Sequence, residues 1–139
     1  MSSSDLKGCE LGPEFADLMI DEYPILSMAA ACAEGHTIMN GISELRVKES
    51  DRIKIVSNGL NKVGIETIEK TDSLEICGGA IRGGCTIDSE LDHRIAMSFL
   101  ILGLVSNKPI KVLRSSTIKT SFPNFFEMML SLGSRFIKG

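Results

Sequence analysis

The architecture of this chain is constrained most by one segment, Asp21-Glu22-Tyr23-Pro24-Ile25-Leu26-Ser27-Met28-Ala29-Ala30-Ala31-Cys32-Ala33. An acidic or capping residue with proline just inside is typical of a helix start, and Glu34-Gly35 is a suitable end. The predicted helix is apolar on every face, so we expect it to be buried all round. A second helix of this kind, Ile95–Val105, follows Leu91-Asp92-His93-Arg94.

The same elements follow each of these two apolar helices. After the first come a short strand and an amphipathic helix, which Glu49 or Ser50 opens and which carries apolar residues at spacings of three and four. Aligning Thr37-Ile38-Met39-Asn40 with Pro109-Ile110-Lys111-Val112 gives an offset of 72 residues, from 37 to 109. Strands are expected at residues 6–11, 37–40, 65–69, 74–77, 110–113 and 135–137, and the second amphipathic helix at 123–132.

This repetition predicts a duplicated α/β (α+β) unit, and repetition is stronger evidence of architecture than any local pattern. We place repeat one at about 14–88 and repeat two at about 89–139. The second copy has one strand after its amphipathic helix, where the first has two or three, so its sheet is expected to have an open edge. An earlier segment of a longer protein or a partner, including a second copy of the chain, would cover that edge.

Composition narrows the class of protein. A net charge of −3 argues against a nucleic-acid binder, and the longest apolar run is too short to span a bilayer. The start, Met1-Ser2-Ser3-Ser4-Asp5, has no apolar core and is no signal peptide. The four cysteines, at positions 9, 32, 77 and 85, form no Cys-x-x-Cys pair, which favours reduced thiols in a cytoplasmic protein without structural zinc. Cys32, in alanine-rich sequence, is expected to act as a small hydrophobe.

Arg46-Val47-Lys48-Glu49-Ser50-Asp51-Arg52 is the strongest candidate for chemistry. Lys48 and Arg52 are four apart, so a helix beginning near Lys48 would place both on one face, beside the free amides of its first turn. Two cations and those amides suit a phosphate or a carboxylate. Glu49 would carry a proton to deliver if a closed site raised its pKa. From composition alone, a solvated helix start of mixed charge is the favoured interpretation.

Asp21 and Asp92 occupy matching places, each at the mouth of an apolar helix. The sequence favours an N-cap for both, although a carboxylate there could also accept a proton from a substrate hydroxyl. Arg94 must face water or a ligand, because burying an unpaired guanidinium is costly. His93 is a structural donor more often than a catalyst.

A weaker candidate site stands where the second amphipathic helix is expected to begin, at Lys119-Thr120-Ser121-Phe122-Pro123. The hydroxyls of Thr120 and Ser121 are suitable helix caps. Lys119 is a further candidate for ligand contact.

These segments, in order, resemble the signatures of the 5-enolpyruvylshikimate-3-phosphate synthase family. The resemblance rests on four stretches and covers nearly the whole chain: Ile20-Asp21-Glu22-Tyr23-Pro24, Arg46 to Arg52, Leu91-Asp92-His93-Arg94-Ile95-Ala96-Met97 and Thr120-Ser121-Phe122-Pro123. It implies a fold of repeated βαβαββ units with helices buried at the centre. The chain is similar to two units of the three-unit C-terminal domain, so residues 1–139 would form a partial domain without the family's N-terminal domain.

The resemblance also implies a reaction, the transfer of the enolpyruvyl group of phosphoenolpyruvate to the 5-hydroxyl of shikimate 3-phosphate with release of phosphate. Asp21 would take the hydroxyl proton, Glu49 would protonate the methylene carbon, and Lys48 would lie at the hydroxyl. Arg52 and Arg94 would hold the phosphoenolpyruvate anion. No cofactor or metal is implied, and the chain alone is expected to be inactive.

The sequence differs from the family pattern at the start of the second amphipathic helix. Many members have a lysine directly before Thr-Phe-Pro, where this chain has Thr120, with Lys119 one residue earlier. The Asp-Glu-x-Pro and Thr-Ser-Phe-Pro forms resemble the glyphosate-tolerant bacterial subgroup. Two alternatives stay open: the sister transferase that acts on UDP-N-acetylglucosamine, and a non-catalytic fragment that binds anions or serves as an interaction module.

Overall fold

The computed structural model describes residues 4–137. Met1–Ser3, part of the segment in which no signal peptide is expected, lie outside the described residues. The helices, 3-10 helices and strands follow one another as β1 (Glu10–Leu11), η1 (Pro13–Phe15), α1 (Ala16–Met19), α2 (Tyr23–Ala31), β2 (His36–Asn40), η2 (Ser43–Val47), α3 (Arg52–Lys62), β3 (Glu66–Glu69), β4 (Ser73–Cys77), β5 (Thr86–Asp88), α4 (His93–Leu102), β6 (Lys111–Leu113), η3 (Ser115–Thr117), α5 (Ile118–Ser121) and α6 (Phe125–Ser131).

The strands form two sheets. A four-stranded sheet has the order β1-β2-β4-β3, in which β1 and β2 are parallel and the other neighbours antiparallel. A separate two-stranded parallel sheet joins β5 to β6. The first unit therefore runs β1-α2-β2-α3-β3-β4, which confirms the predicted βαβαββ order. Because Thr86–Asp88 pairs with β6, the second unit begins with β5, slightly before the predicted boundary at residue 88.

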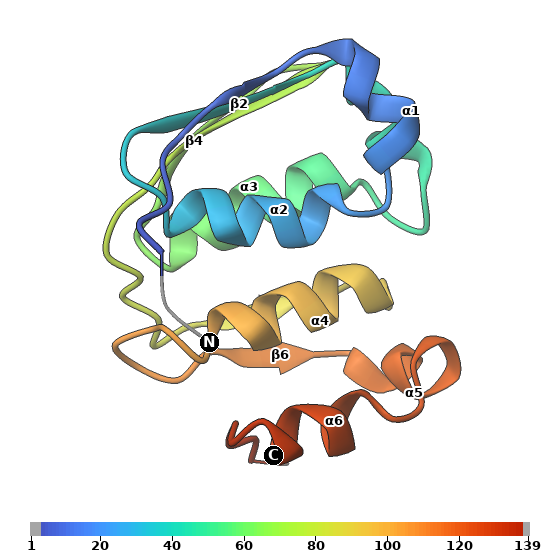
Figure 1. Ribbon diagram of the computed structural model, residues 1–139. Coiled ribbons are helices and arrows are strands. Elements are labelled where there is room, and N and C mark those ends of the chain that lie inside the picture. The colour runs from blue at the N-terminus through green and yellow to red at the C-terminus, as the bar shows by residue number, and fades with distance from the viewer. Residues whose placement is uncertain (1–3, 138–139) are drawn as a thin grey trace.

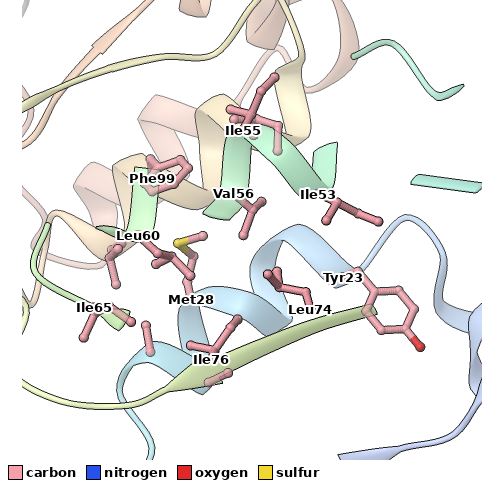
Figure 2. Packing of buried hydrophobic residues seen from close by; sticks show 14 of the residues in the cluster. Tyr23, Met28, Ile53, Ile55, Val56, Leu60, Ile65, Leu74, Ile76 and Phe99 are labelled. Carbon is pink, nitrogen blue, oxygen red and sulfur yellow. The ribbon is translucent and has the colours of Figure 1, made fainter. Parts of the chain in front are cut away.

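The elements form stacked layers (Figure 1). The four-stranded sheet covers α2 and α3, α4 lies beneath them, and β6 and α6 follow. In the core, Met28 of α2 packs with Val56 and Leu60 of α3 against Leu74 and Ile76 of β4 (Figure 2). The burial of these apolar groups is the main stabilising contribution to this unit.

A close approach of α3 and α4 joins the two units. Phe99 of α4 is fully buried. A Cβ added to Gly59 of α3 would lie only 2.2 Å from the nearest carbon of the Phe99 ring. Glycine inside a helix costs about 1 kcal/mol relative to alanine. Here it makes room for an aromatic ring at the boundary between the units.

The two apolar helices lie at the centre and contact each other, as expected. They are not buried all round, however. Ile25 of α2 is 38% exposed, and in α4 Met97 and Leu100 are only half-buried. Cys32 is exposed, so the prediction that it acts as a small hydrophobe is wrong.

Several predicted bounds need correction. Of residues 6–11 only Glu10–Leu11 forms a strand, with an isolated bridge between Lys7 and Glu34. Helix α4 ends at Leu102, and the helix expected at 123–132 begins at Phe125. Residues 135–137 form no strand.

The start of α3 is the correction with most consequence for function. The helix begins at Arg52, because the Asp51 side chain accepts the Lys54 amide and caps it. Lys48 precedes it in extended conformation, at the end of η2. Lys48 and Arg52 therefore do not share a helical face, contrary to the sequence prediction. Separately, none of the helices within residues 4–137 has the length and hydrophobicity that crossing a bilayer requires.

Candidate active site

The Arg52 guanidinium is the centre of a charged cluster. Arg52 is the first residue of α3 and is 1% exposed. Its Nε lies 2.8 Å from Asp92 Oδ2, its Nη1 lies 3.0 Å from Asp21 Oδ1, and its Nη2 lies 2.6 Å from Glu49 Oε2. The cluster thus joins residues of both units at the mouths of α2, α3 and α4.

Asp92 is the buried anion that orients Arg52. It caps α4, with its carboxylate accepting the amides of Arg94 and Ile95, and it also accepts the Ser50 hydroxyl at 3.0 Å. The N-cap predicted for Asp92 is confirmed. Burial acts to raise the pKa of Asp92, but the hydrogen bond and charge of Arg52 outweigh it, so the pKa is lowered.

The pKa of Arg52 is consistent with this pairing. Burial acts to lower the pKa of the guanidinium, yet the hydrogen bond and charge of Asp92, with contributions from Asp21 and Glu49, raise it overall. Arg52 and Asp92 therefore form a charged pair inside the protein. Removing one member of such a pair is expected to be costly.

Asp21 has a different place from Asp92, so the N-cap predicted for it is wrong. Backbone geometry makes Glu22 the N-cap of α2, without a capping side-chain bond. The Asp21 carboxylate instead lies between two guanidiniums, 3.0 Å from Arg52 Nη1 and 3.3 Å from Arg94 Nη2. The side chain is 44% exposed, so a ligand can reach it.

Arg94 is the second residue of α4 and lies at the solvent side of the cluster, as the sequence predicts. Its side chain is 35% exposed, and Nη1 donates to the Asp21 carbonyl at 3.1 Å. Glu22 lies farther away, 4.0 Å from Nη1. Arg94 is thus the guanidinium of this cluster that water and ligands can approach.

Lys48, His93, Lys119 and Thr120 do not join the cluster through hydrogen bonds or ion pairs among residues 4–137. Lys48 pairs with Glu44 of η2. His93 is the half-buried first residue of α4. Lys119 and Thr120 are exposed residues of α5. The cap position of α6 is Asn124, so the predicted capping role of Thr120 and Ser121 is wrong.

The balance of charge in the cluster matters for any anionic ligand. Three carboxylates, of Asp21, Glu49 and Asp92, face two guanidiniums, of Arg52 and Arg94. An incoming anion can approach Arg94 directly, but it can contact Arg52 only by taking over contacts that Asp21 or Glu49 now makes. Asp21 and Glu49 are 44% and 51% exposed, which makes them the displaceable partners.

Sequence reasoning missed Ser50 as a donor to Asp92, and it did not pair Asp92 with Arg52. The available signal was chemical, since a buried guanidinium requires a buried carboxylate. Arg52 and Asp92 are 40 positions apart in the sequence, so no local pattern identified that partner.

Comparison with known proteins identifies the family of this chain. The profile of the EPSP synthase family, 3-phosphoshikimate 1-carboxyvinyltransferase, matches residues 3–129. The chain belongs to the EPSP synthase family. A member from Cereibacter sphaeroides, named 3-phosphoshikimate 1-carboxyvinyltransferase, is 52% identical over 138 residues, which are 99% of this chain and 31% of that protein. A protein of the same name from Brucella melitensis is 51% identical, over 97% of this chain and 31% of its own length.

Two solved structures show the same fold. The EPSP synthase of Acinetobacter baumannii superposes with a TM-score of 0.87 at 44% identity, over 91% of this chain and 30% of that protein. The enolpyruvyl transferase NikO of Streptomyces tendae superposes with a TM-score of 0.76 at 20% identity, over 96% and 30% of the two chains, which shows a shared fold. The chain thus spans about 30% of the length of the relatives it matches.

Proposed function

We propose that this chain supplies one wall of the active site of a longer enzyme, as a partial C-terminal domain of two units. That enzyme would transfer the enolpyruvyl group of phosphoenolpyruvate to the 5-hydroxyl of shikimate 3-phosphate and release phosphate. The observation that carries the proposal is the convergence of Asp21, Glu49, Arg52 and Arg94 around the buried Asp92. Family membership and the names of the relatives supply the reaction.

The chemistry needs a proton donor, a proton acceptor and fixed cations. Glu49, protonated, would deliver its proton to the methylene carbon of phosphoenolpyruvate, which makes the adjacent carbon electrophilic. The 5-hydroxyl oxygen would bond to that carbon as its proton passes to Asp21, giving a tetrahedral ketal. Loss of a proton from the new methyl group, with departure of phosphate, would then restore the double bond. Both carboxylates are solvent-accessible, which suits proton exchange.

The two guanidiniums would have unequal roles. Arg94 is accessible and would receive the phosphoenolpyruvate anion directly. Arg52 is 1% exposed and already has three carboxylate partners, so its contact with the anion would require Glu49 or Asp21 to move. Such an exchange of partners would release Glu49 to take up the proton it must deliver. Lys48 could reach the hydroxyl only after leaving Glu44.

The exposure of the cluster supports the proposal that a second wall is needed. Transfer through a cationic intermediate requires a site shielded from water, where fixed charges act strongly. In this chain Asp21, Glu49 and Arg94 are all more than a third exposed. We therefore expect residues 1–139 alone to lack transferase activity.

The two-stranded sheet has an open edge at β6 in the described part of the chain. Within residues 4–137, β6 pairs with β5 as its sole neighbour in the sheet. We propose that another part of the longer protein, or a second copy of this chain, pairs with it. Light scattering of the isolated chain distinguishes these, since a concentration-dependent dimer indicates pairing between copies. The expected location in the cytoplasm stays a prediction.

The test of function is an acceptor comparison with the complete protein. Phosphate release and product mass are followed with phosphoenolpyruvate and either shikimate 3-phosphate or UDP-N-acetylglucosamine. We expect turnover with shikimate 3-phosphate alone. Turnover confined to the nucleotide sugar would identify the sister transferase, and turnover with neither acceptor would favour a non-catalytic role.

A further inference from the structure

Arg46 opens the charged segment Arg46–Arg52, but its side chain takes no part in the cluster around Arg52. Its Nε donates to the carbonyl of Thr71 at 2.8 Å, and Nη2 donates to the carbonyl of Lys70. Its Nη1 lies 3.0 Å from Glu69 Oε1 and 3.0 Å from Asp51 Oδ2. The guanidinium therefore binds the turn between β3 and β4 on one side and the N-cap of α3 on the other.

These contacts anchor both ends of a short loop. Residues 47–50 lie between Arg46 and Asp51, and Asp51 also accepts the Lys54 amide at 3.0 Å. A neighbouring contact strengthens the same attachment, because Asp72 accepts the Ser43 amide at 2.8 Å. The loop that carries Lys48 and Glu49 is thus closed by an Arg46–Asp51 pair and fixed to the hairpin.

Packing cannot hold this loop in place. Val47 is 79% exposed and the Glu49 side chain 51% exposed, so neither lies in the core. Arg46 itself is only partly exposed, at 22% of its side chain, and its planar fork is filled by carbonyl and carboxylate oxygens. The conformation of the loop therefore depends on polar contacts. Arg46 and Asp51 make those at its two ends, and within it Lys48 pairs with Glu44, Glu49 with Arg52 and Ser50 with Asp92.

We propose that Arg46 is a positioning residue, which fixes the loop 47–50 and thereby places Glu49 and Lys48 for proton transfer. This inference rests on the proposed function and extends it to a residue outside the reacting cluster. Positioning of a proton donor affects the chemical step strongly, since a displacement of about 1 Å can lower the rate about 100-fold.

The test uses the complete protein with Arg46→Met, which keeps the length of the side chain and removes the donors. We expect kcat to fall about 10- to 100-fold. KM for either substrate should change less than about threefold, because Arg46 contacts neither Arg52 nor Arg94. Arg46→Lys should give an intermediate kcat, because an ammonium restores the charge without the fork.

Two further variants separate positioning from folding. Glu69→Gln removes one partner of Arg46 at the hairpin, so it should lower kcat less than Arg46→Met does. In the double variant the two effects on kcat should not add, because both changes disrupt the same contact. Glu75→Gln is its matched control on β4, because Glu75 pairs with His36 and not with Arg46. Arg82→Met is the control for the lost charge, since Arg82 lies beside Gly64 just beyond the far end of α3.

Hydrogen exchange of the amides of residues 47–50 reports on the loop without any need for turnover. In Arg46→Met we expect exchange at least about fivefold faster, and in Arg82→Met no change. Absence of turnover in the wild-type complete protein would overturn the proposed function and the positioning role with it. Wild-type kcat in Arg46→Met and Glu69→Gln, or unchanged exchange in Arg46→Met, overturns the positioning role alone. If Arg46→Met does not fold, a lowered kcat in Glu69→Gln supports the proposal and a wild-type kcat refutes it.

Discussion

Replacing Asp92 with asparagine removes the charge that balances Arg52 in the interior and leaves the shape nearly unchanged. Asp92 is fully buried, and its Oδ2 lies 2.8 Å from Arg52 Nε. Asparagine is as good an N-cap as aspartate, so α4 should keep its cap. Asp92→Ala removes both the charge and the cap, which lets the two contributions be separated.

The contacts of Asp92 determine how much unfolding free energy its replacement should remove. Breaking a buried ion pair by removing one partner costs about 3–5 kcal/mol. Arg52 keeps Asp21 and Glu49 as partners, but these are exposed and screened, so we expect the low end, about 3 kcal/mol, for Asp92→Asn. Loss of the cap adds about 1 kcal/mol in Asp92→Ala. Against a typical total stability of about 5–15 kcal/mol, either change is large.

Urea unfolding of the 139-residue chain, followed by circular dichroism, measures the loss of unfolding free energy. With a slope of about 2 kcal/mol per molar urea, a loss of about 3 kcal/mol lowers the midpoint by about 1.5 M. Asp88→Asn is the control, because Asp88 is an exposed aspartate paired with Arg114, and its midpoint should stay near wild type. A wild-type midpoint in Asp92→Asn would refute the view that Arg52 depends on a buried carboxylate partner.

Three further results are expected. The pKa of Asp92 is lowered from its ordinary 3.8 in the folded protein, so its stabilising contribution is complete above about pH 4 and is lost as the pH falls through the folded pKa. In urea titrations, the difference in unfolding midpoint between wild type and Asp92→Asn should therefore narrow at low pH. Glu49→Gln in the complete protein should lower kcat by about 10²- to 10⁴-fold with an unchanged circular dichroism spectrum, and wild-type turnover would remove Glu49 from the mechanism. The 139-residue chain mixed with both substrates should release no phosphate above background, whereas release at the rate of the complete protein would show that the chain already holds a whole site.

The sequence predicted the architecture well because apolar patterning and repetition determine it. Two helices without a polar face had to lie at the centre, and the order of elements around them recurred. It predicted the beginnings of helices less well, because Ser50 and Asp51 are both suitable caps, and only the fold shows that Asp51 is used. That difference moved Lys48 off the helix.

The sequence singled out the charged residues of the cluster but not their contacts, and their roles in catalysis stay a prediction. Asp21 and Asp92 look equivalent in sequence, yet Asp92 caps a helix in the interior while Asp21 bridges two arginines at the surface. Arg52 was expected to be free to bind an anion, and the structure gives it three carboxylate partners. Such pairings join residues 31 and 40 positions apart, so no local pattern could reveal them.

Deuterium incorporation tests most directly the claim that this cluster handles a proton at the reacting carbon. The complete protein is supplied with phosphoenolpyruvate and shikimate 3-phosphate in D₂O, and the product is examined by mass spectrometry. If the methylene carbon is protonated and a proton is then lost, the enolpyruvyl group of the wild-type product should contain deuterium. In Glu49→Gln the rate of deuterium incorporation should fall together with the turnover rate. Product formed without deuterium, or incorporation at the wild-type rate in Glu49→Gln, would contradict the mechanism.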